Sequence, residues 1–331
     1  MISKYRSFLQ YAIPIIIALA ISVIVSKEAP LALHEHPGDA TIFTSFSQGL
    51  EEYKEIKQEW RPRILSNYLA SRLANLIEAQ YNGQDSALVM DYVSAYWTIG
   101  WLILIYLMFI IFFKEKSLLY LFGIFAGISF AYVPSIGITR IYPWDMTSLF
   151  IFTCFVTILK TKKESWLVFF IPIAILFKET ALLMIAAFLF WEEVPLRRRL
   201  IYVGITLLTS LVIKAGIDII TANPSFIFTM TYSTKSGTSR IIENIRQLLV
   251  LRIDSPLFID AGLLAALLLL PIRKRPLLML KLIAIAFILG NFVFGQIFEF
   301  RIWFEMIPIS LYALDVYFFS SDTSLPFSQE T

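Results

Sequence analysis

The chain has 331 residues, of which 58% are apolar and only 16% are charged, whereas an ordinary soluble domain has roughly 25% charged residues. With a mean hydropathy of +0.72, it carries more apolar surface than a soluble globule of this length can bury. This composition excludes a disordered chain, a secreted disulfide scaffold and a nucleic-acid-binding domain, and it predicts an all-α polytopic membrane protein. The net charge of +3 is less informative than the placement of the charges along the chain.

Stretches without charged residues mark the expected membrane helices. The first three cover residues 7–26, 92–113 and 117–139, and each is close to or longer than the ~20 residues that a bilayer core requires. Further candidates follow at about 143–159, 200–220, 256–272, 277–298 and 302–319.

The interval 27–92 is long and polar, with six Lys or Arg against ten Asp or Glu. We expect this large first loop to be extracytoplasmic, because cytoplasmic loops carry an excess of basic residues. Two amphipathic helices are predicted in it, one starting at Ala40 behind Asp39 as its N-cap and one following Pro62. The second has an apolar stripe of Ile64, Leu65, Tyr68, Leu69, Leu73 and Leu76. Both patterns are typical of helices that lie on a membrane surface.

The apolar segment 166–191 has Lys178 and Glu179 near its centre, and it fits either one long helix or two half-length helices. The basic residues near the N-terminus place that end in the cytoplasm. If the segment crosses once, the basic clusters 197–199 and 273–275 fall outside, whereas two short helices place both clusters inside. We therefore predict two short helices, and about ten membrane helices in all.

This topology describes a multi-pass protein of the plasma (inner) membrane with both termini in the cytoplasm. A single transmembrane domain covers residues 1–320, and the polar tail 321–331 is cytoplasmic. Residues 221–255 form a second extracytoplasmic loop.

In this topology, the charged residues beside or within the apolar stretches gather on the extracytoplasmic side. They are Asp39, Arg140, Asp145, Lys178, Glu179, Glu299, Arg301 and Glu305. Ionised groups near hydrocarbon are costly, so a set of them indicates a functional site. Cations can hold a phosphate leaving group while a carboxylate removes a proton from an attacking hydroxyl. The simpler alternative is a set of interfacial ion pairs that satisfy one another.

Short motifs along most of the chain resemble the GT-C glycosyltransferases, which are polytopic membrane enzymes that use polyprenyl-phosphate sugars. The matching segments are residues 36–43 around Asp39, 61–65 with Arg61 and Arg63, 142–150 around Asp145, 176–182 around Lys178, and 299–303 with Arg301, followed by Pro308. Two positions depart from the family pattern. Ala40 follows Asp39 where the family often has a second acid. Glu179 and Thr180 stand where the family often has Gly-Pro.

The resemblance implies an inverting glycosyltransferase that moves a sugar from a polyprenyl-phosphate donor to an extracytoplasmic acceptor. Asp39 would be the catalytic base. The lipid phosphate would be bound by Arg301, Lys178 and Arg140. The site would be supported by Asp145, Glu179, Arg61, Arg63, Glu299 and Glu305. The implied partners are the lipid-linked sugar, its acceptor and membrane lipid. The resemblance implies no certain cofactor and leaves the use of a divalent metal open.

Other functions fit the same pattern. A lipid or polysaccharide transporter or flippase also places charges and broken helices at membrane depth. Another membrane transferase, such as a polysaccharide polymerase or an acyltransferase, would keep the lipid-linked substrate but use a different acid-base group. A non-catalytic assembly subunit would use its buried charges to bind a partner helix.

Individual residues also have simpler roles open to them. Lys178 and Glu179 could pair only with each other. Asp145 could serve only as a cap of its helix. His34 and His36 could bind a metal together with a nearby acid, or lie in a solvated loop.

Overall fold

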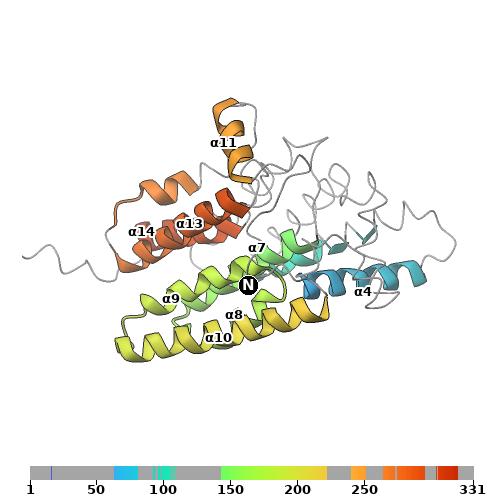
Figure 1. Ribbon diagram of the computed structural model, residues 1–331, viewed down its shortest axis with the longest axis horizontal. Helices are drawn as coiled ribbons and strands as arrows, with labels where there is room; N and C mark the ends of the chain where they lie inside the picture. The colour runs from blue at the N-terminus through green and yellow to red at the C-terminus, as the bar shows by residue number, and fades with distance from the viewer. Residues whose placement is uncertain are drawn as a thin grey trace, which may run out of the picture.

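A computed structural model gives the structure of the chain. It describes residue 16 and the ranges 63–80, 92–93, 96–97, 99–105, 107–108, 143–221, 240–250, 264–272, 274–294, 303 and 305–319. Within these residues every regular element is a helix and no strand occurs (Figure 1). The all-α class is therefore confirmed for the described part of the chain. The expected membrane helix 117–139 lies outside it, as do nearly all of 7–26, the surface helix after Asp39 and the tail 321–331.

Helix α7, Pro143–Lys160, coincides with the apolar stretch expected at about 143–159. A proline suits the first position of a helix, because the N–H that it lacks has no partner within a first turn. Asp145 follows in the same turn, where a carboxylate interacts favourably with the positive end of the helix dipole.

The other end of α7 closes in a Schellman turn, which satisfies carbonyl groups that a helix end otherwise leaves unbonded. The N–H of Lys163 bonds to the carbonyl of Ile158 at 3.1 Å. The N–H of Lys162 bonds to the carbonyl of Leu159, also at 3.1 Å. Lys162 adopts the left-handed conformation that this turn requires, with φ of 53°.

Two short helices replace one long helix between residues 166 and 191, as predicted. The first is α8, Leu167–Ile175. After a turn at Lys178, the chain continues as the 3₁₀ helix η3, Glu179–Ile185, and the short helix α9, Ala186–Leu189. Because α8 and η3 pack against each other, the chain doubles back as a hairpin. A single 3₁₀ turn, η2, Glu164–Trp166, links α7 to α8.

Two helices in the part of the chain that the structure describes are long and apolar enough to cross a membrane. They are α10, Leu196–Ile220, and α13, Arg275–Phe294, of which Arg275–Val293 meets the criterion. They correspond to the stretches expected at about 200–220 and 277–298. The predicted total of about ten membrane helices goes beyond what these two establish.

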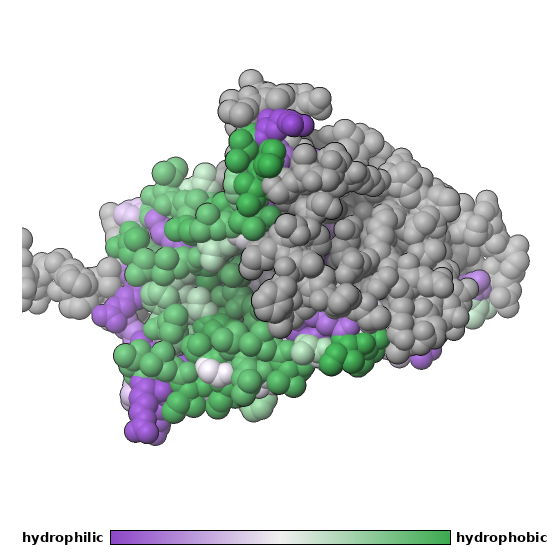
Figure 2. All heavy atoms as spheres, in the orientation of Figure 1, coloured by the Kyte–Doolittle hydropathy of each residue, from purple (hydrophilic) through white to green (hydrophobic). Residues whose placement is uncertain are grey.

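Helix α10 is apolar on its outside and polar on its inside. Its exposed residues include Leu200, Leu208 and Val212. Its buried residues are Thr206, Ser210, Lys214, Ile217 and Asp218. Figure 2 shows the corresponding apolar surface over the described helices. This distribution is the reverse of that on a helix that packs on a protein core and faces water.

Several other helices pack against the hairpin. Helix α10 packs against α8 and α9, while α13 packs against η3 and α9. Helix α14, Met306–Phe319, packs against α13 and α7. The largest fully buried side chains are Phe152, Phe155, Phe188, Phe287 and Leu102. At the end where α7 finishes, Lys160 forms an ion pair with Asp315 of α14, and Lys274 Nζ donates to the carbonyl of Val316 at 3.0 Å.

Helix α4, Ile64–Gln80, confirms the helix predicted after Pro62. It packs against α7 through a face of small and polar residues. These buried residues are Ser66, Asn67, Ala70, Ser71, Ala74 and Ile77. Tyr68 and Leu76 of the predicted apolar stripe are exposed. The protein-facing side of α4 therefore consists largely of small and polar residues, and part of its apolar stripe is exposed.

Candidate functional site

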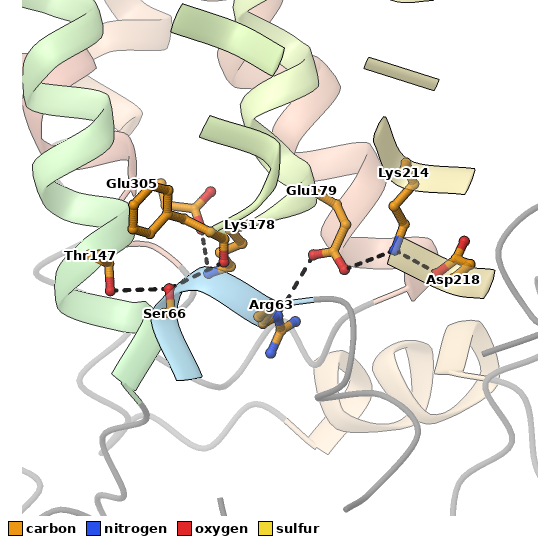
Figure 3. Close-up of polar contacts among 9 residues, drawn as sticks. Arg63, Ser66, Thr147, Lys178, Glu179, Lys214, Asp218 and Glu305 are labelled. Carbon is orange, nitrogen blue, oxygen red and sulfur yellow. Dashed lines mark hydrogen bonds and ion pairs between the residues drawn. The ribbon is translucent and has the colours of Figure 1, made fainter. Parts of the chain in front are cut away.

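The turn between α8 and η3 separates two neighbouring charges. Lys178 has extended backbone angles, φ −161° and ψ 138°, and successive side chains along an extended chain point to opposite sides. Lys178 reaches Glu305, just before α14, whereas Glu179 reaches α4 and α10 (Figure 3). The alternative in which these two neighbours pair only with each other is therefore wrong.

Lys178 and Glu305, which we call the inner pair, form a buried ion pair. Glu305 is fully buried, and the Lys178 side chain is 8% exposed. Each charge stabilises the other, because burying an unpaired ion costs several kcal/mol of folding free energy. The pair fixes the tip of the hairpin to the residues that precede α14.

Four further charges form what we call the outer cluster: Arg63, Glu179, Lys214 and Asp218. Glu179 forms ion pairs with two cations, with Arg63 Nε 3.6 Å from Oε2 and Lys214 Nζ 3.7 Å from Oε1. Lys214 also lies 3.2 Å from Asp218 Oδ1, one helical turn further along α10. The side chains of Arg63 and Glu179 are 23% and 33% exposed. The outer cluster therefore opens to the surface at these two residues.

The carboxylate of Glu179 lies between two cations. The guanidinium of Arg63 faces one of its oxygens and the ammonium of Lys214 faces the other. Opposite charges this close stabilise one another. Glu179 therefore holds the two cations in place on either side of the turn.

Helix α4 is attached directly to the hairpin, and this attachment positions Arg63. The N–H of Leu65 donates to the carbonyl of Leu176 at 3.0 Å. Since helices leave N–H groups unbonded at their start and carbonyls at their end, α4 and α8 satisfy each other here. Ser66 Oγ lies 3.4 Å from the carbonyl of Phe177 and 3.4 Å from Thr147 Oγ1.

An aromatic ring holds the guanidinium of Arg63 from the other side. Its Cζ lies 4.4 Å from the ring centroid of Trp144, in the first turn of α7, and arginine stacks favourably on such a ring. Asp145 is buried beside Trp144. The first turns of α4 and α7 therefore meet at the tip of the hairpin.

The structure brings together half of the residues predicted for the site. Those at this end of the bundle are Lys178, Glu179, Arg63, Asp145 and Glu305. The remaining ones, Asp39, Arg61, Arg140, Glu299 and Arg301, lie outside the described residues, and their roles stay predictions.

Lys214 and Asp218 are members of the cluster that the sequence analysis did not select. The signal was present, because the two residues are oppositely charged, four positions apart and set in an otherwise apolar helix. Their burial on the protein-facing side of α10 distinguishes them from interfacial residues.

The outer cluster can bind an anion at its exposed edge. The Nε atom of Arg63 faces Glu179, and the plane of its guanidinium lies over the ring of Trp144. This arrangement suits a guanidinium group whose terminal nitrogens bind a phosphate. Among the described residues no group of three His, Cys, Asp or Glu could hold a metal ion. No family model, curated protein or solved structure matches the chain. What the site can do therefore follows from its own residues.

Proposed function

We propose that the protein is a membrane glycosyltransferase that moves a sugar from a polyprenyl-phosphate donor to an extracytoplasmic acceptor. The observation that supports it is the convergence of ionised side chains from four distant segments at one end of apolar helices. Arg63 immediately precedes α4, Lys178 lies in the hairpin, Lys214 lies in α10, and Glu305 immediately precedes α14. Ionised groups beside hydrocarbon are costly, so a concentration of them indicates a functional site.

In this proposal the chain crosses the plasma (inner) membrane about ten times, with both termini in the cytoplasm. The tip of the hairpin then lies below the outer surface of the bilayer. A polyprenyl phosphate can reach it sideways from the lipid, because the exposed side of α10 is apolar. Non-helical backbone at the tip is tolerated at that depth, since it is enclosed by α4, α7 and α14.

The roles divide between cations and one base. Arg301 and Arg140 bind the phosphate, and Arg63 joins them at the open edge of the outer cluster. Their charge stabilises the phosphate as it leaves the sugar. Lys178, which was expected to bind it as well, is paired with the buried Glu305 and instead fixes the hairpin beside the phosphate. Asp39 takes the proton of the acceptor hydroxyl, whose oxygen attacks the anomeric carbon from the opposite face and inverts it. Glu179, paired with Arg63 and Lys214, keeps the cations at fixed separations.

Purified protein in lipid vesicles tests this proposal with a panel of polyprenyl-phosphate hexoses and pentoses. Release of polyprenyl phosphate and formation of the glycosylated acceptor are measured. Asp39→Asn should abolish transfer but keep binding of a long-chain polyprenyl phosphate. Full activity in that variant would remove Asp39 as the base.

A second measurement tests the phosphate site without any acceptor. Arg63→Ala should weaken polyprenyl-phosphate binding by about 10-fold or more, which corresponds to one charge-assisted hydrogen bond. Arg72→Ala is the matched control, because Arg72 lies on the same helix but contacts Tyr68, with its Nε 3.1 Å from the phenol oxygen. Equal binding by both variants would exclude Arg63 from the phosphate site.

A further inference from the structure

Helix α11, Arg240–Val250, occupies part of the interval expected as the second extracytoplasmic loop. It packs against α13, and Asn244 anchors it there. Asn244 is fully buried, and its Nδ2 donates to the carbonyl of Phe292 at 2.8 Å. Phe292 belongs to the last turn of α13, so α11 sits at the end of a candidate membrane helix.

The residues of α11 divide into two faces. Ile241, Ile242 and Ile245 are 37%, 52% and 45% exposed, and at 100° per residue they lie on one side of the helix. Glu243 lies on the opposite side. The apolar side thus faces away from the protein, which is unfavourable if that side meets water.

The orientation of α11 explains this exposure. Figure 1 shows α11 running across the direction of α10 and α13 rather than along it. Figure 2 shows its apolar atoms continuing into the apolar surface over α13, where Ile285 and Leu289 are also exposed. If α10 and α13 cross the bilayer, α11 lies along its outer surface with the isoleucines turned to the lipid.

We propose that α11 is an interfacial helix that docks on the outer leaflet, with Ile241, Ile242 and Ile245 among the upper acyl chains. Its sequence contains two arginines, Arg240 and Arg246, against one acid, so the helix is attracted to anionic headgroups. A bilayer fits better than a protein partner, because the exposed face is only three side chains wide and continues the surface that lipid already covers. Docking fixes the second extracytoplasmic loop at the membrane surface.

Depth-dependent quenching tests this docking. A single fluorescent label is attached to Ile245→Cys, or to Glu243→Cys as the matched control, in a Cys154→Ala background. The full-length protein is placed in phosphatidylcholine vesicles with or without phosphatidylglycerol. A nitroxide on the lipid acyl chain should quench the label at 245 several times more than the label at 243. Aqueous iodide should show the reverse order.

Three results would overturn the proposal in whole or in part. Equal acyl-chain quenching at 243 and 245 would show that the isoleucine face does not enter the lipid. Shielding of position 245 from iodide only at high protein density would assign the face to a second copy of the chain. If acyl-chain quenching does not rise with phosphatidylglycerol, the arginines do not contribute to membrane binding. The inference rests on the membrane embedding in the proposed function, but the readout needs no sugar donor, so docking and transfer can fail separately.

Discussion

Lys178 and Glu305 are joined in a buried ion pair that ties the tip of the hairpin to the start of α14. The two residues come from segments that are distant in the sequence. Both side chains are withdrawn from solvent almost completely. The pair therefore makes the position of the hairpin depend on α14, which in turn packs on α7 and α13.

Loss of one member of the inner pair should destabilise the protein strongly. Lys178→Met leaves the carboxylate of Glu305 buried without its cation, and Glu305→Gln leaves the ammonium of Lys178 without its anion. Either change should lower the free energy of unfolding by about 3–5 kcal/mol. Thermal or denaturant unfolding of the purified protein in detergent measures this loss.

The double variant is the control for this prediction. Lys178→Met combined with Glu305→Leu removes both charges and should recover most of the lost stability, because buried ion pairs are often replaceable by apolar residues of similar volume. If the double variant is as unstable as the sum of the single variants, the two residues act independently and the pairing is not what stabilises the turn.

The charge of Glu179 should contribute to stability. Glu179→Gln keeps the size of the side chain but removes the carboxylate between Arg63 and Lys214, so both cations lose the anion that lies between them. The melting temperature of Glu179→Gln should therefore be several degrees lower than that of the wild type. Thermal unfolding of the purified protein in detergent measures this difference.

Glu192→Gln is the matched control for this prediction. Glu192 also pairs with an arginine, with its Oε1 2.9 Å from Arg275 Nε, but its side chain is 53% exposed. Exposed pairs contribute little to stability, so Glu192→Gln should change the melting temperature only slightly. An equally small change for Glu179→Gln would show that its carboxylate charge is not what matters.

The sequence predicted the helices of the described region well, because their causes are local. Long apolar stretches with few charged residues give α7, α10 and α13 within a few residues, and the helix after Pro62 follows from its start signal and apolar stripe. The break at Lys178 was predictable for a different reason. The two basic clusters at 197–199 and 273–275 fall on one side only if the segment doubles back.

The partners of the charged side chains could not be predicted in the same way. Lys178 and Glu179 are adjacent in the sequence, yet extended backbone at Lys178 directs them to different helices. Lys214 joins the site because of how α10 is rotated about its axis, and that rotation is set by packing against α8 and α9. For α4, periodicity predicted an apolar stripe. The face that α4 buries against the protein consists instead of small and polar residues.

Lys162→Gly should stabilise the end of α7. Lys162 holds a left-handed backbone conformation at φ 53°, which costs a residue with a side chain about 1 kcal/mol relative to glycine. The Schellman turn itself is retained, since its hydrogen bonds use only backbone atoms. The expected result is a rise in the melting temperature, whereas Lys162→Ala should give none. An unchanged or lower melting temperature for the glycine variant would mean that the lysine side chain contributes more than the strain removes.

The opposite ends of α10 should lie on opposite sides of the membrane. The helix has 25 residues, which is about 37 Å at ~1.5 Å per residue and exceeds the ~30 Å hydrocarbon core. Arg198 is exposed in its first turn, and Arg246 is exposed on α11, after its far end. In a Cys154→Ala background, a membrane-impermeant maleimide should label Arg246→Cys from the outside of intact cells and Arg198→Cys only after the cytoplasmic side is opened. Labelling of both positions from one side would mean that α10 does not cross. The tip of the hairpin would then not lie near the outer surface of the bilayer, and a lipid phosphate could not reach Arg63 from the outer leaflet.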